Sequence, residues 1–253
     1  TVKATGQSSF HQSKFAPYPD GFSFNAIDDV YNAIDDETVA VMIELVQGEG
    51  GVFPFDKEKI KELAKFLKEN DILLIIDEVQ TGVFRTGEFL ASNLYDIEPD
   101  IITLAKGIGG GVPMGAVMTK HKDIWTAGDH GSTFGGNYLV TAAALEVLDI
   151  LENLKDSGTL DETIIYFTKK LNDIFEANRD IFITHVGLGL MRGLRVKDAD
   201  TLASLIKTAF EFGVMVLKSG NNTLRFLPAL TISKSEIDEG FIRLQKAITK
   251  IKS

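Results

Sequence analysis

The feature that most constrains the fold is a series of short apolar runs separated by stretches with helical spacing. The runs lie at residues 39–46, 72–76, 101–104 and 115–118, and polar residues do not alternate along them. Strands that are buried on both faces have this pattern, which is typical of parallel sheets covered by helices. Residues 57–70 place their apolar side chains on one side of a helix. We therefore expect an α/β fold with a mostly parallel sheet covered by helices on both faces.

The second part of the chain has a different pattern, in which helices alternate with shorter strand-like runs. The helical stretches lie at residues 160–178, 201–212 and 233–251, and the strand-like runs at residues 181–186, 190–196, 214–217 and 224–227. The last helix opens with Ser233 and Glu236, which form a capping-box signature. Before this part, residues 138–151 predict a helix with little polar surface, which we expect to be well buried. We predict a large domain over residues 1–155 and a smaller C-terminal α+β domain over residues 156–253.

Composition excludes several kinds of protein. The 253 residues include no cysteine, which rules out a disulfide scaffold, a thiolate metal site and a cysteine nucleophile. The four histidines are too scattered to predict a metal site. A net charge of −10 disfavours nucleic acid and anionic membranes as partners, and no apolar run is long enough to cross a bilayer. The absence of cysteine is natural in a reducing compartment.

An acidic pair, Asp77 and Glu78, directly follows the apolar run at residues 72–76. In open α/β sheets, ligands bind beyond the carboxyl ends of the strands, so this pair lies where a site is expected. A carboxylate at that depth is costly unless a cation or a hydrogen-bond donor faces it. Taken alone, this segment is better explained by an ion-paired or helix-capping aspartate.

A single lysine, Lys106, follows the run at residues 101–104 and precedes four glycines within residues 107–111. Glycines allow left-handed backbone angles and the close approach of a ligand. A phosphate-binding loop is one interpretation, although the spacing fits neither GxGxxG nor GxxxxGK[ST]. A lysine that reaches solvent is the second. The third is a lysine in a dry pocket, where desolvation frees the amine to form a Schiff base.

The two strand ends together favour the third interpretation. Pyridoxal phosphate (PLP) requires a lysine for its aldehyde and an acid beside its pyridine nitrogen. Lys106 and Asp77 supply this pair from two strands of the expected sheet. At about 4 Å and an effective dielectric constant of about 20, the pairing of the acid with the ring is worth roughly 4 kcal/mol before desolvation. The sequence therefore indicates a PLP enzyme.

Five segments in a fixed order resemble the class III (ornithine-type) aminotransferases of fold type I. They are IELVQGEGGV (43–52), LLIIDEVQTGVFRTG (73–87), PDIITLAKGIGGGVPMGAV (99–117), DHGSTFGGN (129–137) and LRFLPAL (224–230). The resemblance covers essentially the whole chain. It implies the fold type I of PLP-dependent transferases, a homodimer with shared active sites and a cytoplasmic location. Three phrases most resemble family members that act on N2-acetylornithine: KFAPYPDGF (14–22), GGGVPMGAV (109–117) and LRFLPALTISKSEID (224–238).

The resemblance also implies roles for the residues of the two strand ends. Lys106 would bind the cofactor aldehyde and act as the general acid/base of the proton transfer. Asp77 would pair with the ring nitrogen, Val79 would contact a ring face, and Gln80 would bind the ring 3-hydroxyl. Glu78 belongs to the same cofactor motif.

Four further residues receive roles from the resemblance. Thr133 would reach the cofactor phosphate of the neighbouring subunit, and Ser132 would lie beside the substrate. Arg225 would bind the substrate carboxylate through two parallel hydrogen bonds, and Glu49 would pair with Arg225 in the other half of the cycle. One pocket would then accept both glutamate and a longer amine donor. Without the resemblance, a fixed Glu–Arg bridge between domains explains this pair equally well.

The implied reaction transfers the δ-amino group of N2-acetylornithine to 2-oxoglutarate, as in arginine biosynthesis. One alternative is a sibling enzyme that acts on ornithine or 4-aminobutyrate, and another is an inactive fragment that serves only as a dimerisation module. Family members continue upstream of Thr1 with a phosphate-binding turn, a ring-stacking aromatic residue and a substrate-binding arginine, and we expect this chain to start after them. Leu45 and Tyr138 stand where the family usually has proline.

Overall fold

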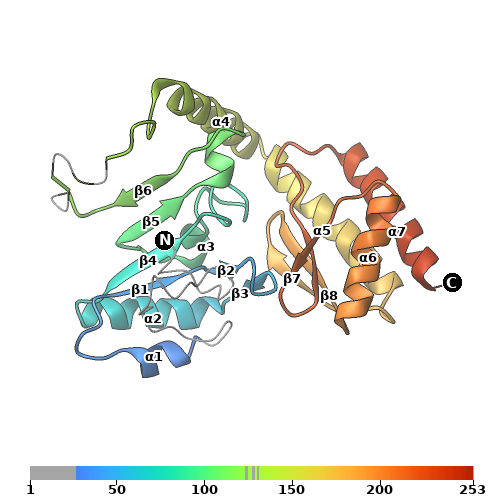
Figure 1. Cartoon of the computed structure of the whole chain (residues 1–253), viewed down its shortest axis with the longest axis horizontal. Helices are drawn as coiled ribbons and strands as arrows, with labels where there is room; N and C mark the ends of the chain where they lie inside the picture. Colours follow the sequence, from blue (N-terminus) through green and yellow to red (C-terminus); the bar gives the residue numbers. More distant parts are fainter. Residues whose placement is uncertain (1–26, 123–124, 127–128, 130, 253) are drawn as a thin grey trace.

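The computed structural model describes residues 27–122, 125–126, 129 and 131–252, and its longer strands form two four-stranded sheets (Figure 1). The first sheet has the order β1-β4-β5-β6. Its strands are β1 (Ala40–Ile43), β4 (Leu73–Asp77), β5 (Ile101–Leu104) and β6 (Ala116–Thr119). Strands β1, β4 and β5 are parallel, and β6 is antiparallel to β5. The mostly parallel sheet predicted from the apolar runs is thus confirmed.

The first apolar run is divided between two sheets. Strand β1 ends at Ile43, and the short strand β2 (Val46–Gln47) pairs with β3 (Phe53–Pro54) in a separate two-stranded ribbon. The chain between these strands, residues 48–52, forms a tight turn that includes Gly51 and Val52 at φ values of +109° and +54°. This turn carries Glu49 toward the second half of the molecule.

Helix α2 (Lys57–Glu69) covers one face of the first sheet. Asp56 caps it by accepting a hydrogen bond from the Lys59 amide at 3.0 Å. Its buried side chains Ile60, Leu63 and Leu67 share a hydrophobic cluster with Leu74 and Ile76 of β4. The short helices α1 (Asp29–Ala33) and α3 (Ala91–Tyr95) add Val30, Ala91 and Tyr95 to this cluster.

Coverage of the first sheet by the described residues is less complete than its apolar runs indicate. Met42 on β1 and both Val117 and Met118 on β6 remain exposed. Along β4, burial alternates between buried and half-buried positions instead of being continuous. Among the described parts of the chain, helices therefore enclose one face of this sheet more fully than the other.

The second sheet has the order β7-β8-β10-β9 and is antiparallel throughout. Its strands are β7 (Phe182–Leu188), β8 (Met191–Val196), β9 (Leu217–Ser219) and β10 (Thr223–Phe226). Helices α5 (Thr159–Ala177), α6 (Ala199–Glu211) and α7 (Lys234–Lys252) lie against its outer face (Figure 1). The capping box of α7 is confirmed, because the Glu236 amide donates to Ser233 Oγ and the Ser233 amide donates to Glu236 Oε2.

The strand predicted at residues 214–217 was placed too early. Gly213 adopts a left-handed φ of +77° at the end of α6, and the Val214 amide donates to the Ala209 carbonyl at 2.9 Å. This glycine-ended helix terminus uses the residues that the apolar run assigned to the strand. Strand β9 consequently begins only at Leu217.

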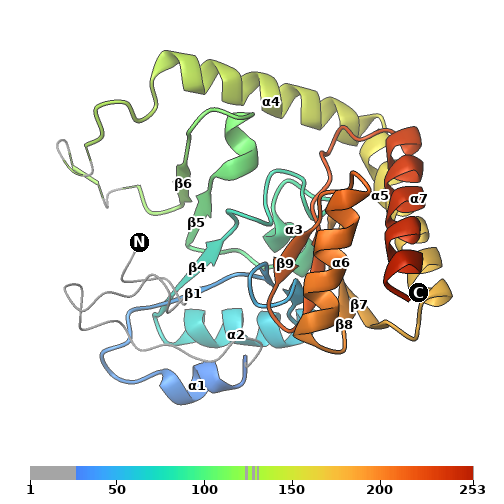
Figure 2. The ribbon, with the colours of Figure 1, turned by 45° about the vertical axis from the view of Figure 1, so that its right-hand side comes forward.

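Helix α4 (Tyr138–Asp156) runs along one side of the molecule from the first sheet to the second half (Figure 2). The prediction that it is well buried is wrong for the described residues. Tyr138, Leu139 and Leu145 are 95%, 73% and 64% exposed, whereas Val140 and Ala144 are buried. The sequence correctly predicted an apolar helix, but one side of that helix has no covering element among the described residues.

One hydrophobic core joins the two halves. It includes Leu104 and Ile108 from the first half together with Phe167, Leu194 and Phe241 from the second. The predicted boundary between residues 155 and 156 falls at the end of α4. The division into two domains stays a prediction, since this shared core crosses it. No helix in the described ranges is long and apolar enough to cross a membrane.

Candidate active site

Three charged side chains follow or end adjacent parallel strands of the first sheet. Glu44 comes directly after β1, Asp77 is the last residue of β4, and Lys106 lies two residues beyond the end of β5. Asp77 is the register partner of Thr103 on β5. The strand order β1-β4-β5 therefore brings the three groups to one edge of the sheet, where α/β proteins bind their ligands.

Asp77 is oriented by two hydrogen bonds to the same carboxylate oxygen. Its Oδ1 accepts from the Val79 amide at 2.9 Å and from the Thr103 hydroxyl at 3.3 Å. Within the described ranges, no group donates to Oδ2. The half-buried carboxylate is thus held at Oδ1 and, among the described residues, free at Oδ2. A free carboxylate oxygen can accept a hydrogen bond from a positively charged N–H group of a ligand.

Lys106 begins the short 3-10 turn η3 (Lys106–Gly109) with a left-handed φ of +50°. Such angles are uncommon for lysine, and backbone strain of this kind is found most often at functional sites. The side chain is exposed, and none of the described residues forms a hydrogen bond or an ion pair with its amine. The dry pocket expected around this lysine is therefore not formed by the described residues.

Glu44 is a site residue that the sequence analysis did not select. It is half-buried, and its Oε2 accepts a hydrogen bond from the Gly48 amide at 3.2 Å. The pKa of the Glu44 carboxyl is raised to about 7, chiefly by burial. The negative charges of Asp77 and Glu49 add to the rise, and the Gly48 amide and Lys106 oppose it. Its position after β1, at the same end of the sheet as Asp77, was the signal that could have identified it.

We expect Glu44→Gln to remove a pH dependence of stability. The carboxyl titrates near its ordinary pKa of 4.5 in the unfolded chain and near about 7 in the folded chain, so the folded state holds the proton more tightly. Its stabilising contribution is therefore complete below pH 4.5 and is lost as the pH rises through 7. Urea unfolding without added cofactor should show the wild type losing about 3 kcal/mol relative to Glu44→Gln by about pH 8. Parallel pH profiles of the two proteins would contradict this assignment.

The Glu78 carboxylate is buried and bound by hydrogen-bond donors of the protein. Glu78 is only 1% exposed, and its carboxylate accepts hydrogen bonds from the Ala91 amide, the Ser92 amide, the Ser92 hydroxyl and the Thr81 hydroxyl, at 2.5 to 3.0 Å. Glu78 therefore anchors the start of α3 behind the strand end. These four donors occupy both carboxylate oxygens and give Glu78 a structural role, and the cofactor contact expected for it stays a prediction.

Arg225 joins the two halves at the other side of the site. Its Nη1 donates to Glu49 Oε1 at 2.7 Å and to the Gly48 carbonyl at 3.0 Å, with a longer contact to Gln80 Oε1 at 3.4 Å. The Arg225 side chain is 10% exposed and that of Glu49 is 39% exposed. Glu49 is thus the partner that can move away into solvent while Arg225 stays in place.

Arg225 also has a buried donor without an acceptor in the described parts of the chain. Its Nε is fully buried and makes no hydrogen bond there. Buried donors in proteins are nearly always paired, and an unpaired one requires an explanation. The Nε atoms of Arg192 and Arg195 are buried and, among the described residues, unpaired in the same way, so this feature alone does not mark a ligand site. The planar guanidinium of Arg225, held at Nη1 beside Glu49, is of the kind that binds a carboxylate.

Ser132 and Thr133 lie apart from the other predicted site residues. Both are exposed, in the segment between β6 and α4, and Ser132 Oγ accepts a hydrogen bond from the Gly135 amide at 3.1 Å. No contact among described residues connects either of them with Asp77, Lys106 or Arg225. The structure thus brings together Gln80, Glu49 and Arg225 through hydrogen bonds, and it places Asp77 and Lys106 at the ends of the neighbouring strands β4 and β5. The expected place of Ser132 beside the substrate and the expected contact of Thr133 with the cofactor phosphate of a neighbouring subunit both stay predictions.

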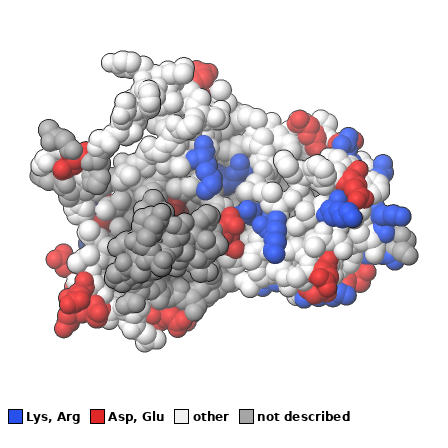
Figure 3. Space-filling model, viewed as in Figure 1, with Lys and Arg blue, Asp and Glu red and all other residues white. Residues whose placement is uncertain are grey.

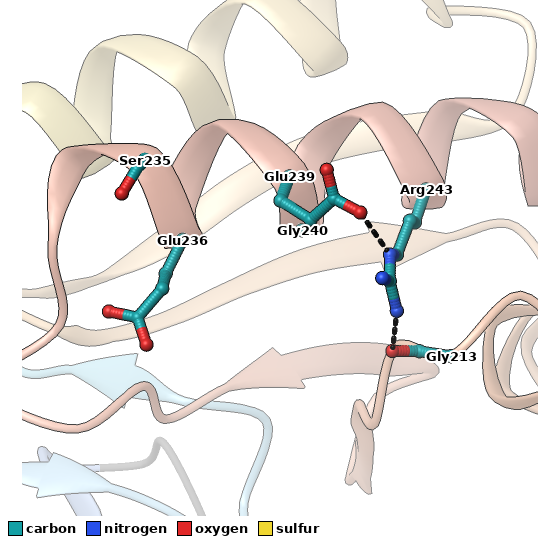
Figure 4. A pocket seen from close by; sticks show the side chains of 6 residues that line it. All are labelled: Gly213, Ser235, Glu236, Glu239, Gly240 and Arg243. Atoms are coloured by element: carbon teal, nitrogen blue, oxygen red, sulfur yellow. Dashed lines mark hydrogen bonds and ion pairs between the residues drawn. The ribbon is translucent and has the colours of Figure 1, made fainter.

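The charges on the surface also mark the region between the two halves. Figure 3 shows Lys and Arg side chains gathered near the middle of the face, with acidic atoms beside them. A hollow on the second half lies between α7 and Gly213, which is two residues beyond the end of α6 (Figure 4). Its one arginine, Arg243, is engaged by Glu239 at 2.7 Å and by the Gly213 carbonyl at 3.2 Å. The cation of this hollow is therefore already neutralised by protein groups.

Comparison with known proteins gives a consistent result. Residues 2–248 match the class-III aminotransferase family. The chain is 54% identical to an acetylornithine aminotransferase of Wolinella succinogenes over 251 residues, which cover 99% of the chain and 64% of that protein. It is 41% identical to a succinylornithine transaminase of Salmonella enteritidis, with 100% of the chain and 63% of that protein covered.

A solved structure is also similar. The ornithine aminotransferase of Toxoplasma gondii, which was crystallised with oxidised glutathione and shows partial occupancy of PLP at its active site, superposes with a TM-score of 0.87 at 28% identity. The superposition covers 99% of the chain and 61% of that protein. The chain spans slightly less than two thirds of the length of these curated and solved relatives.

Proposed function

Because the chain belongs to the class-III aminotransferase family, we propose that the protein is a PLP-dependent enzyme that transfers the δ-amino group of N2-acetylornithine to 2-oxoglutarate. The observation that carries this proposal is the placement of Asp77 and Lys106 at the carboxyl ends of neighbouring parallel strands. An acid and a lysine in this arrangement are the two groups that a PLP site requires.

The residues of the site fit PLP on the observations above. The open Oδ2 of Asp77 would accept the N–H of the protonated ring, and Val79 would contact the ring face. Gln80, held near Arg225 and Glu49, would bind the ring 3-hydroxyl. When bound, PLP supplies an electron sink that stabilises negative charge on the substrate carbon. Lys106 would hold the cofactor and carry the proton removed from that carbon.

Arg225 and Glu49 would let one pocket accept two kinds of substrate. When Glu49 forms its ion pair with Arg225, the positive charge of Arg225 is neutralised. The pocket then suits an amine donor that has no second carboxylate facing Arg225. When the more exposed Glu49 moves away, Arg225 can bind a carboxylate of 2-oxoglutarate or glutamate. Arg225 itself is fixed by the Gly48 carbonyl, so its position does not depend on Glu49 alone.

The choice of amine donor can be tested directly. The two curated relatives named above act, by their names, on acetylornithine and succinylornithine, which supports an N-acylated donor. Transamination of 2-oxoglutarate should be measured with N2-acetylornithine, N2-succinylornithine, ornithine and 4-aminobutyrate. We expect the highest kcat/KM with N2-acetylornithine. A preference for ornithine or 4-aminobutyrate would reassign the substrate, and no activity with any donor would contradict the proposed reaction.

Asp77→Asn is expected to lower transamination by about 100-fold to 1,000-fold, because the loss of a charge pairing of roughly 4 kcal/mol corresponds to nearly three decades in rate. The asparagine can keep the Oδ1 hydrogen bonds to Val79 and Thr103, so the melting temperature should change little. Steady-state kinetics and thermal unfolding measure the two effects. Activity within twofold of wild type would show that Asp77 does not stabilise the protonated ring.

We further infer a homodimer with shared active sites. The exposed apolar side chains of α4 form an apolar surface of the kind that marks protein–protein contacts. This surface directly follows, in the sequence, the segment that carries Ser132 and Thr133. Thr133 would then contact the cofactor phosphate of the partner subunit. We also place the protein in the cytoplasm, in keeping with a chain that contains no cysteine.

A further inference from the structure

The turn that carries Glu49 is held by a hairpin from the second half of the molecule. Ser219 Oγ donates to the Gly48 carbonyl at 2.6 Å and accepts from the Gly51 amide at 3.0 Å. The Gly220 amide donates to the Glu49 carbonyl at 2.9 Å. These bonds connect residues about 170 positions apart in sequence, so the turn is fixed by tertiary contacts and not by its own local structure.

Asn221 adds a further bond, because its Nδ2 donates to the Gly50 carbonyl at 3.0 Å. It also shapes the hairpin: Asn221 and Asn222 have left-handed φ values of +52° and +51°, and the Thr223 amide closes the turn on the Gly220 carbonyl at 3.2 Å. Asparagine tolerates such angles better than most residues. The hairpin between β9 and β10 is thus preformed to face the Glu49 turn.

Glycines allow the two turns to approach closely. A Cβ atom on Gly220 would lie 2.7 Å from the Glu49 carbonyl oxygen, and one on Gly51 would lie 2.9 Å from the Gly220 carbonyl oxygen. Both distances are shorter than a side chain permits. The backbones of the two turns therefore interlock, and Ser219, only 3% exposed, lies at the centre of the contact.

We propose that Ser219 is a positioning residue, which fixes the backbone of the Glu49 turn so that the Glu49 carboxylate alone moves when Arg225 binds a dicarboxylate. This inference rests on the proposed function of Arg225 and Glu49. The Gly48 carbonyl links the two roles, because it accepts hydrogen bonds from both Ser219 Oγ and Arg225 Nη1. Loss of the Ser219 hydroxyl would therefore disturb Arg225 as well as Glu49.

Hydrogen exchange tests the positioning without any ligand. We expect Ser219→Ala to accelerate amide exchange in peptides that contain residues 48–52 by about tenfold, since a buried hydrogen-bond network is opened. The matched control is Thr163→Ala, which also removes a buried hydroxyl, one that donates to the Thr159 carbonyl within α5. This control should leave the exchange of residues 48–52 unchanged. Equal exchange in wild type and Ser219→Ala would overturn the proposal.

Glutarate, an unreactive dicarboxylate, tests the consequence for substrate binding. With the full chain loaded with PLP, we expect Ser219→Ala to raise the Kd for glutarate by about fivefold to tenfold and to leave the Kd for PLP near that of wild type. In the control Thr163→Ala, the Kd for glutarate and the Kd for PLP should both stay near those of wild type. Faster exchange with an unchanged Kd for glutarate would reduce Ser219 to a structural role and overturn the proposal. A wild-type protein that binds PLP but no glutarate would contradict the proposed function of Arg225 and the substrate part of this inference, whereas the exchange result still decides whether Ser219 holds the turn.

Discussion

Lys106→Ala is expected to lower transamination by at least about 10³-fold and to abolish covalent retention of PLP. The loss combines the removal of the amine that holds the cofactor with the removal of a general acid/base, which by itself contributes about 10² to 10⁴ in rate. In the wild type, borohydride reduction with PLP followed by digestion and mass spectrometry should find a phosphopyridoxyl group on Lys106. The exposed turn at the end of β5 makes this amine accessible to the reagent.

The control for this experiment is Lys207→Ala, which removes an exposed lysine from α6. Helix α6 lies against the second sheet and does not contribute to the ends of β4 and β5. The Lys207→Ala variant should retain the label on Lys106 and full activity. Label spread over several surface lysines, or equal labelling of the wild type and Lys106→Ala, would contradict the assignment of Lys106. An unlabelled wild type would indicate that this chain does not form the complete cofactor site.

Gly189→Ala is expected to lower the free energy of unfolding by about 3 kcal/mol, the sum of a left-handed backbone and an overpacked contact. Gly189 has a φ of +54°, and an added Cβ would overlap the Thr86 carbonyl carbon and lie 2.6 Å from the Arg85 carbonyl oxygen. The turn between β7 and β8 thus contacts the loop that follows Gln80. The Leu190 amide bonds to the Arg85 carbonyl at 3.0 Å, and Arg85 Nη1 donates to the Leu190 carbonyl at 3.2 Å.

Gly240→Ala is the matched control for this substitution. Gly240 lies within α7, and an added Cβ would meet no atom within 4 Å. In a helix this change should stabilise the protein by up to about 1 kcal/mol. Urea unfolding of the two variants gives the comparison. If Gly189→Ala is as stable as the wild type, the contact between the two halves at this place adapts more easily than its geometry indicates.

The sequence alone determined the elements of the fold that depend on local patterns. The apolar runs predicted β4, β5 and β6 to within one residue, and helical spacing predicted α2 over nearly its full length. Ser233 and Glu236 predicted the start of α7, because a capping box acts within one turn. Asp77 and Lys106 could be selected for the same reason, since each lies at or just after the end of a recognisable apolar run.

Other features depended on contacts that no local pattern contains. The burial of α4 depends on what lies against it, so an apolar sequence predicted a buried helix that is largely open among the described residues. Glu78 resembled a site residue in sequence, yet four donors from Thr81 and the start of α3 give it a structural role. The raised pKa of Glu44 required its burial and its position near Asp77 to be known.

The contact between the Glu49 turn and Arg225 shows the same division most clearly. The sequence, through its resemblance to a family, identified the two charged residues as a pair. Only the tertiary structure revealed the hairpin of Ser219 and Asn221 that holds the turn, because these bonds span about 170 residues and form only when the two halves meet. Local periodicity specifies which residues form strands and helices, whereas the orientation of a side chain in the site is decided by long-range packing and hydrogen bonding.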